Sequence, residues 1–301
     1  MFTNKLVGMG VALVTPFKKD FSVDFEALEK LVEFQIQNGT DYLVVLGTTG
    51  ETPTLKENEK KQIIDTVIKV NQSRLPIVLG VGGNDTMGVI NQISKTDFSH
   101  IDAILSVAPY YNKPSQEGLY QHYSTIAKST NMPIILYNVP GRTGVNISAE
   151  TTIRLAREFD SIVAIKEASG NFKQIDEIIK NKPSNFMVIS GDDGITFPLI
   201  TLGAVGVISV VGNAFPKEFS KMVRLAFRGD LQGARAMHYH FVEMIDLLFR
   251  DGNPAGVKSI LSCMGYIENV LRLPLVPTTT NTSEKLNEIL KNLKSEIAYK
   301  Q

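Results

Sequence analysis

The chain contains eight short apolar runs that are rich in β-branched residues and do not alternate between apolar and polar positions. Each run is bounded by Gly, Pro or Asn. Runs of this kind are typical of parallel strands that are buried on both faces. They predict strands at residues 11–14, 42–46, 77–79, 103–107, 134–137, 162–165, 186–189 and 207–210.

The segments between the runs repeat their apolar positions with helical spacing. Residues 24–37 place their apolar side chains on one stripe and stop at Gly39, and residues 57–70 show the same pattern. Eight strands that alternate with helices predict a closed (β/α)₈ barrel, the TIM barrel, in the α/β class. A doubly wound open sheet is the alternative, because the number of strands does not prove closure.

After Gly229 the strand pattern stops and only helical spacing continues. Helices are expected at residues 230–249, 254–264 and 283–299. We therefore predict two regions, a catalytic barrel over residues 1–229 and a helical C-terminal region over residues 230–301.

The charge of the chain is balanced, with 31 Lys and Arg against 31 Asp and Glu. No net field favours nucleic acid or an anionic membrane, and we expect neither as a partner. The single cysteine, Cys263, excludes an internal disulfide and fits a reducing compartment, so a cytoplasmic protein is expected. We assign Cys263 to the core of a helix.

In a barrel of this type, the catalytic side chains lie at the carboxyl ends of the strands and in the loops that follow. Polar side chains occupy this place at five of the predicted strands and should meet at one mouth. They are Thr48 and Thr49 after the second strand, Tyr110 and Tyr111 after the fourth, Tyr137 and Arg142 at the fifth, Lys166 after the sixth, and Asp192 and Asp193 after the seventh.

Lys166 directly follows the sixth apolar run, so its side chain should begin in the wall of the barrel. A lysine at a strand end can simply extend its ammonium group to water. Here the neighbouring loops supply proton-handling groups. A lysine ammonium group ordinarily has a pKa of about 10.4, and partial burial would favour its neutral amine form. We interpret Lys166 as a nucleophile that forms a Schiff base with a small α-keto acid.

Tyr137 and Thr48 could move protons as a carbinolamine dehydrates, although each could also cap a strand end. Arg142 offers a planar fork that suits a carboxylate, with an exposed loop arginine as the alternative. No histidines and carboxylates show metal-site spacing, which disfavours a zinc-dependent aldolase. Asp192 and Asp193 could bind a cation, but a hydrogen-bonded loop fits them better.

Three motifs resemble those of the dihydrodipicolinate synthase family. They are Gly47-Thr48-Thr49-Gly50-Glu51, residues 137–144 (Tyr-Asn-Val-Pro-Gly-Arg-Thr-Gly) and residues 165–170 (Ile-Lys-Glu-Ala-Ser-Gly). The resemblance extends from residues 10–17 to Asn253-Pro254 and residues 271–274, and thus covers nearly the whole chain. The family belongs to a wider group of pyruvate-dependent lyases and aldolases. Within this group, the arginine that matches Arg142 distinguishes the synthases.

The resemblance implies that Lys166 forms the imine with pyruvate. Tyr137, Thr48 and Tyr111 would form a proton relay, with Tyr111 reaching in from a neighbouring subunit. The enamine would attack the aldehyde of L-aspartate 4-semialdehyde, and cyclisation would give 4-hydroxy-tetrahydrodipicolinate on the route to lysine and diaminopimelate. No metal or other cofactor is expected, because the imine itself serves as the electron sink.

The resemblance also assigns the substrate contacts. Thr49 and the main chain at Gly191 and Ile208 would line the pyruvate site, and Arg142 would bind the carboxylate of the semialdehyde. A homodimer is expected as the unit of assembly, and a homotetramer as the complete particle.

Members of the family that lysine inhibits carry an allosteric pocket at the dimer interface. The matching residues here are Thr52, Pro53, Glu57, Lys60, Asn84, Gly88 and Tyr110. Asn84 and Tyr110 keep the family pattern, but Gly88 replaces a glutamate that receives the amino group of lysine, and Lys60 replaces a histidine. A buried ammonium without a partner is costly, so weak inhibition is expected unless Glu57 supplies the missing carboxylate.

Two other functions stay open at this point. Another aldolase of the same group, acting on a sugar-derived keto acid, would share Lys166 and Tyr137. A non-catalytic barrel that binds a small acid and regulates a partner belongs to a different class, and it would not need the relay.

Overall fold

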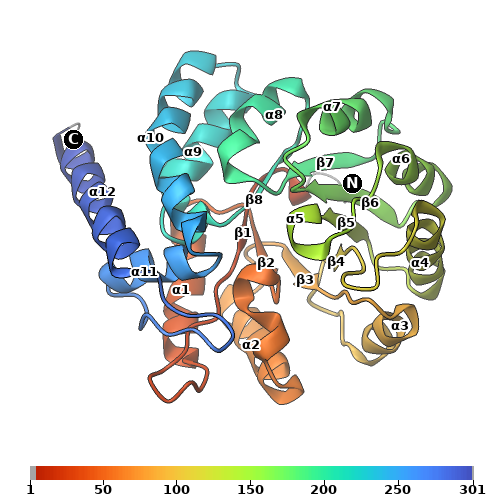
Figure 1. The fold of residues 1–301 in the computed structure, drawn as a ribbon, viewed down its shortest axis with the longest axis horizontal. Helices are drawn as coiled ribbons and strands as arrows, with labels where there is room; N and C mark the ends of the chain where they lie inside the picture. The colour runs from red at the N-terminus through yellow and green to blue at the C-terminus, as the bar shows by residue number, and fades with distance from the viewer. Residues whose placement is uncertain (1–4, 300–301) are drawn as a thin grey trace.

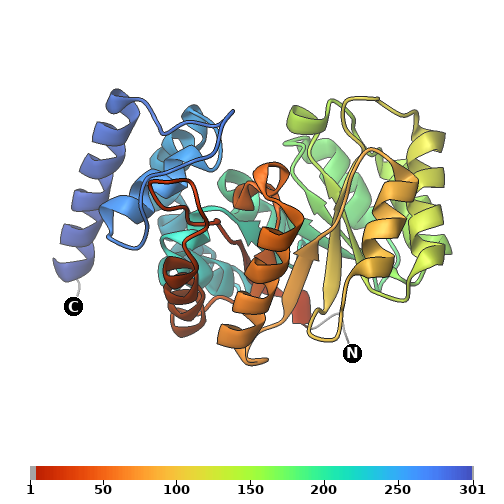
Figure 2. The same cartoon turned by 90° about the horizontal axis from the view of Figure 1, so that it is seen from below.

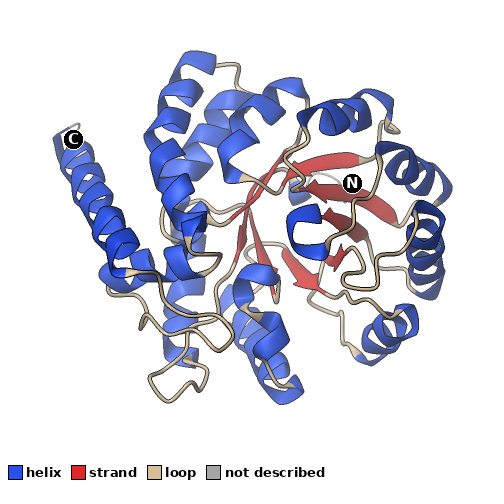
Figure 3. Ribbon diagram, in the orientation of Figure 1, coloured by secondary structure: helices blue, strands red, loops and turns tan. Residues whose placement is uncertain are grey.

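The computed structural model describes residues 5–299, and its strands close into a parallel barrel in which β1 pairs with both β2 and β8. Figures 1 and 3 show the ring of strands enclosed by helices. The predicted (β/α)₈ barrel is therefore confirmed, and the open sheet is wrong. The strands are β1 (Gly8–Ala12), β2 (Tyr42–Val45), β3 (Ile77–Gly80), β4 (Ala103–Val107), β5 (Ile134–Asn138), β6 (Ile162–Glu167), β7 (Met187–Ser190) and β8 (Gly206–Ser209).

Helices cover the outside of the barrel, as their apolar stripes predict (Figure 2). The longer ones are α1 (Phe25–Gln37), α2 (Glu57–Asn71), α3 (Thr86–Lys95), α4 (Gln116–Ser129), α6 (Ala149–Glu158), α7 (Phe172–Asn181), α8 (Thr196–Leu202) and α9 (Pro216–Phe227). Short helical turns follow several strands, namely η2 (Thr48–Gly50), η3 (Thr52–Thr54), α5 (Pro140–Thr143), η4 (Asp193–Ile195) and η5 (Val211–Asn213).

The strand side chains divide between two cores, because successive residues of a strand point to opposite faces. Ile135 and Ala164 point into the barrel, whereas Ile134 and Ile165 pack outward against the helices. The alternation decides which of two adjacent polar residues at a strand end reaches the interior.

The first strand was placed too late by its sequence pattern. Residues 11–14 were expected, but β1 is Gly8–Ala12. Position 10 must be glycine, because the Cβ of any other residue would lie 2.1 Å from the ring of Tyr42, which fills the interior beside it. Apolar content could not reveal a strand that begins with two glycines in three residues. The other strands lie within two residues of the expected positions.

The chain continues into α10 (Leu231–Arg250), α11 (Ala255–Cys263) and α12 (Thr280–Tyr299), which lie along one flank of the barrel (blue in Figures 1 and 2). Phe241 of α10 belongs to the same hydrophobic cluster as Phe219 of α9 and Met9 of β1. The cluster thus crosses the expected boundary at residue 229, and the division into two regions stays a prediction. The ends of those regions, residues 1–4 and 300–301, lie outside the described residues.

Cys263 is the last residue of α11 and is exposed, so its assignment to a helix core is wrong. The apolar stripe of α11 contains Val257, Ile260 and Leu261, and Cys263 lies beside it. Among residues 5–299, no helix has both the length and the apolar content needed to cross a bilayer.

A buried ion pair joins the C-terminal region to the loop after β2. Lys258 of α11 contacts the carboxylate of Glu51, and both side chains are fully buried. The Nζ of Lys258 also donates to the carbonyl oxygen of Val270 at 2.9 Å, and the N–H of Arg272 donates to Glu51 at 3.0 Å. If either segment were displaced, the other would keep a buried charge without a partner, which is costly. The loop after β2 and the C-terminal helices therefore form one structural unit.

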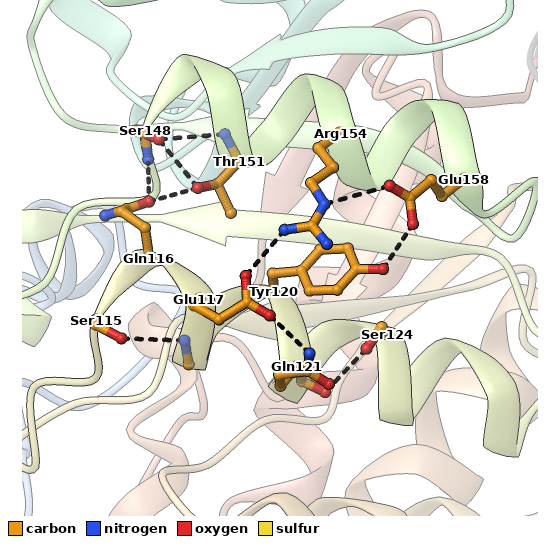
Figure 4. Close-up of polar contacts among 11 residues, drawn as sticks. Ser115, Gln116, Glu117, Tyr120, Gln121, Ser124, Ser148, Thr151, Arg154 and Glu158 are labelled. Carbon is orange, nitrogen blue, oxygen red and sulfur yellow. Dashed lines mark hydrogen bonds and ion pairs between the residues drawn. The ribbon is translucent and has the colours of Figure 1, made fainter.

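On the outside of the barrel, polar side chains join α4 to α6 (Figure 4). Arg154 donates to Glu117 at 2.9 Å and to Glu158 at 3.2 Å, and its guanidinium carbon lies 3.4 Å from the centre of the Tyr120 ring. The hydroxyl of Tyr120 completes the network by donating to Glu158 at 2.6 Å. The charged groups are exposed and Tyr120 is half-buried, so each contact contributes little, but together they orient two helices that flank β5.

Asp193 begins η4 and is buried against the exit of β8. Its Oδ2 accepts the N–H groups of Val210 and Val211, both at 2.9 Å. Burial raises the pKa of Asp193 to about 6, and these hydrogen bonds oppose the rise. Among the described residues, no three potential metal ligands of the His, Cys, Asp and Glu types come together. The hydrogen bonds from Val210 and Val211 to Asp193 form a hydrogen-bonded loop of the kind that was expected.

This shift predicts a specific pH dependence of stability. Between pH 3.8 and about 6, the folded state keeps a proton on Asp193 that the unfolded state has lost. The contribution of this group therefore falls as pH rises, by up to about 3 kcal/mol. Asp193→Asn should remove that loss, because the amide oxygen can still accept both N–H groups.

Denaturant unfolding of the wild type and of Asp193→Asn at pH 4 and pH 7 measures the effect. The variant should gain stability relative to the wild type at the higher pH. Asp192→Asn, at the half-buried neighbour, controls for the loss of a charge from this loop. An equal difference in unfolding free energy at both pH values would contradict the assignment to Asp193.

Candidate active site

Lys166 and Tyr137 lie opposite one another on β6 and β5. The sequence placed Lys166 after the strand, but β6 extends through it. The pairing depends on an irregularity near the start of the two strands, where β6 carries one extra residue, Val163, relative to β5. A shift of one residue exchanges the two faces of a strand, so this irregularity puts Lys166 on the interior face that Tyr137 occupies.

The side chain of Lys166 is buried against the aromatic ring. Its Nζ lies 4.2 Å from the centre of the Tyr137 ring, and only 6% of each residue is exposed. Gly191 leaves room for the lysine, because a Cβ there would lie 3.0 Å from Cε of Lys166. Ile208 of β8 shares the interior core with Tyr137. The structure therefore brings these four predicted site residues into the interior of the barrel.

The loop after β2 is a tight turn that presents two threonines. Leu46 and Glu51, on either side of it, have φ values of 56° and 53°, in the left-handed region. Thr48 is half-buried, whereas Thr49 is buried and its Oγ1 accepts a hydrogen bond from Nδ2 of Asn253 at 3.0 Å. Thr48 thus lines the cavity described below, whereas the hydroxyl of Thr49 contacts the C-terminal region.

Arg142 lies on α5, which follows β5 directly and is drawn across the ring of strands in Figure 1. The arginine is exposed, and its Nη2 donates to the carbonyl oxygen of Asn253 at 3.4 Å. Thr143 stabilises the turn, because its Oγ1 donates to the carbonyl oxygen of Val145 at 2.8 Å. The loop thus holds the guanidinium near the mouth of the barrel.

A cavity of about 390 Å³ opens at this end of the barrel. Its size suits a small organic molecule. Its walls bring together Thr48, Tyr137, Arg142 and Tyr110, which come from four separate loops or strands. The remaining lining residues are Leu46, Gly47, Thr52, Pro53, Lys60, Gly80, Gly82, Gln92, Leu105, Val107, Val139 and Thr143.

Tyr111 is not among the residues that line this cavity. Its side chain is 89% exposed, and its φ of 72° is unusual for a residue that bears a side chain. The turn that contains Tyr111 is held at the preceding residue, because Nδ2 of Asn84 donates to the carbonyl oxygen of Tyr110 at 3.1 Å. The structure thus joins Asn84 to Tyr110 and directs Tyr111 outward.

Six of the seven residues of the expected allosteric pocket line two neighbouring hollows, and Asn84 lines neither. Thr52, Pro53 and Lys60 line the cavity with Tyr110, whereas Glu57, Lys60 and Gly88 line a groove of about 690 Å³ beside it. The carboxylate of Glu57 is already paired with Nζ of Lys60 at 2.7 Å. This pairing makes Glu57 less able to replace the missing glutamate, and the expected weak inhibition by lysine stays a prediction.

Asn253 is a site residue that sequence reasoning missed, except as part of the family resemblance. It is buried and contacts both Thr49 and Arg142, and its Oδ1 has no hydrogen-bond partner within residues 5–299. Asn253 does not line the cavity itself but contacts Arg142, which does, and its unpaired amide oxygen is available to a ligand. The only local signal was a polar residue before proline, in a turn between two predicted helices.

Comparison with known proteins identifies relatives over almost the whole length of the chain. Residues 5–293 match the model of the dihydrodipicolinate synthetase family. Proteins named 4-hydroxy-tetrahydrodipicolinate synthase are 68% identical in Parabacteroides distasonis, over 96% of this chain and 97% of the relative, and 63% identical in Phocaeicola vulgatus, over 98% and 99%. The crystal structure of dihydrodipicolinate synthase from Thermotoga maritima superposes with a TM-score of 0.93 at 42% identity, covering 96% of this chain and 98% of that one.

Proposed function

Since this chain belongs to the dihydrodipicolinate synthetase family, we infer that it is a lyase that condenses pyruvate with L-aspartate 4-semialdehyde. The product is 4-hydroxy-tetrahydrodipicolinate, in the biosynthesis of lysine and diaminopimelate. The relatives named above all carry the synthase name. They give no support to an aldolase for sugar-derived keto acids or to a regulatory barrel.

The contact between Lys166 and Tyr137 carries the proposed mechanism. The neutral amine of Lys166 attacks the C2 carbonyl carbon of pyruvate, and the carbonyl oxygen leaves as water to give an imine. Loss of a proton from C3 gives the enamine. C3 then attacks the aldehyde carbon of the semialdehyde, and the aldehyde oxygen takes up a proton. The amino group of the semialdehyde finally attacks the imine carbon, which closes the ring and releases Lys166.

Tyr137 and Thr48 supply and remove the protons of these steps. Both line the cavity, and Tyr137 lies against the amine. Thr49, Gly191 and Ile208 shape the pyruvate site. The imine supplies the electron sink, so the mechanism uses no cofactor.

Arg142 binds the carboxylate of the semialdehyde, and Asn253 is placed to contact the same substrate. The exposed guanidinium at the mouth suits a planar carboxylate. The backbone carbonyl oxygen of Asn253 accepts from this guanidinium, and the unpaired Oδ1 of the same residue can accept a hydrogen bond from the amino group of the semialdehyde.

Tyr111 completes the relay from a second subunit. In its own chain the side chain points outward, as a residue that serves a neighbouring site would. A homodimer is therefore the smallest active unit in this proposal, with a homotetramer as the full assembly.

The mechanism predicts that borohydride will trap pyruvate on Lys166. Treatment with both reagents should inactivate the enzyme and add one reduced three-carbon unit at this residue, and peptide mass spectrometry locates it. Lys166→Ala should lose trapping and lower kcat on the order of a thousandfold or more. Lys258, the other buried lysine of the described region, provides an internal control. A reduced three-carbon unit on Lys258, or none on any residue, would contradict the mechanism.

Arg142→Ala should lose the second substrate and keep the first. Removal of a charge-assisted, bidentate contact costs about 2–4 kcal/mol, or roughly 30- to 900-fold in kcat/KM for the semialdehyde. Borohydride trapping of pyruvate should continue. Arg142→Lys keeps the charge but lacks the planar fork, so its kcat/KM for the semialdehyde should lie between those of the wild type and Arg142→Ala. Equal collapse of trapping would mean that Arg142 organises the lysine instead.

Tyr111 should act in trans. Tyr111→Phe and Lys166→Ala should each be nearly inactive, whereas co-refolding them in equal amounts should restore activity. Half of the dimers are then mixed and one of their two sites is complete, so about a quarter of the wild-type activity is expected. Each variant refolded alone is the control. If isolated mixed dimers stayed inactive, Tyr111 would belong to the site of its own chain.

A further inference from the structure

Directly behind Lys166 and Tyr137, on the outer face of the same two strands, lies a buried group of polar side chains. Asn138 follows Tyr137 and Glu167 follows Lys166, and the two pair across β5 and β6. Together with Asn146 and Gln174 they form what is called here the outer polar cluster. Asn138 and Glu167 have no exposed surface.

Within the outer polar cluster, Glu167 accepts hydrogen bonds from uncharged donors. Nδ2 of Asn138 donates to its two oxygens at 3.0 and 3.1 Å, Nε2 of Gln174 donates to Oε2 at 3.1 Å, and the N–H of Ser169 donates to Oε1 at 3.0 Å. Burial raises the pKa of Glu167, and these hydrogen bonds oppose the rise. A buried carboxylate without a cationic partner is expensive, so packing alone gives no reason for it.

The remaining contacts of the cluster lead to the site. The carbonyl oxygen of Glu167 accepts the N–H of Gly191 at 2.8 Å, which ties β6 to the pyruvate site. Oδ1 of Asn138 accepts the N–H of Ile147 at 3.0 Å and so closes the base of the loop that carries Arg142. The carboxylate of Glu167 therefore connects β6 to β5 and, through Asn138, to the loop of Arg142, while the backbone of the same residue holds Gly191.

We propose that Glu167 is a positioning residue whose carboxylate, acting through Asn138, holds Lys166 opposite Tyr137 and fixes the loop of Arg142. This inference deepens the function proposed above and rests on Lys166 as the residue that forms the imine. An amide cannot replace the carboxylate. Its partners are all donors, so Glu167→Gln sets one N–H group against another.

The test compares Glu167→Gln with the wild type in four measurements: the folded fraction by circular dichroism, kcat, KM for the semialdehyde, and the rate of borohydride trapping with pyruvate. We expect the variant to be folded at the assay temperature. Both kcat and the trapping rate should fall by roughly tenfold to a hundredfold, because small misplacements of reacting groups have effects of this size. KM for the semialdehyde should rise with them.

Two further variants separate positioning from stability. Glu158→Gln removes a carboxylate from the contacts between α4 and α6 that Figure 4 shows. This carboxylate accepts hydrogen bonds from Tyr120 and Arg154 but does not reach a strand end. The variant should keep the wild-type rates. The double variant Asn138→Asp with Glu167→Gln exchanges donor and acceptor across the same contact, and it should regain at least about threefold over Glu167→Gln.

Wild-type rates in folded Glu167→Gln would overturn the proposal, as would a loss that only follows the unfolded fraction or that Glu158→Gln shares. A double variant no faster than Glu167→Gln would also count against it. If Glu167→Gln does not fold, Glu167→Asp takes its place, and its shorter carboxylate should give a partial loss of the same rates. Wild-type rates there would likewise overturn the proposal. Absence of trapping in the wild type would contradict the proposed function instead, so the two failures are distinguishable.

Discussion

The site depends first on the register between β5 and β6. Paired residues on neighbouring strands share a face, and one extra residue in β6, Val163, decides which face Lys166 shares. If the register continued regularly from the pair of Ile134 and Ile162, with Val163 opposite Ile135, Tyr137 would lie opposite Ile165, and Lys166 would point outward among the helices. An amine in the outer layer could not meet a small molecule at the mouth of the barrel. The chemistry of the lysine is therefore a consequence of strand geometry before it is a consequence of its neighbours.

The C-terminal region supplies part of the site as well as part of the core. It contributes the buried partner of Glu51, the amide that donates to Thr49 and the carbonyl oxygen that accepts from Arg142. These contacts reach the loop after β2 and the loop after β5 from outside the barrel. A barrel cut at residue 229 would keep the lysine and the tyrosine, but it would lose the groups that hold the two loops.

Much of this arrangement could be predicted from the sequence, and the failures have physical causes. Unbroken apolar runs revealed the parallel strands, and the rule that barrel chemistry lies at strand ends located Lys166, Tyr137 and Thr48. The same lack of alternation concealed the extra residue in β6. In an apolar run that is buried on both faces, the sequence does not show which residues point into the barrel and which point outward. Gly10 concealed β1, because its role is to make room for a side chain 32 residues away in the chain. Asn253 could not be found locally, because its partners belong to loops that only folding brings near.

The geometry separates the two halves of the reaction. The groups proposed to form the imine lie on strands, and their positions follow from the ladder of backbone hydrogen bonds and from the interior packing. The group proposed to select the second substrate, Arg142, lies on a turn that the barrel holds at its base through Asn138 and that the C-terminal region touches at its tip through Asn253. A loop of this kind can change its residues without shifting a strand. The register between Lys166 and Tyr137 cannot change without moving every side chain beyond it to the opposite face. A barrel built in this way can keep one way of activating pyruvate while its loops determine which aldehyde it accepts.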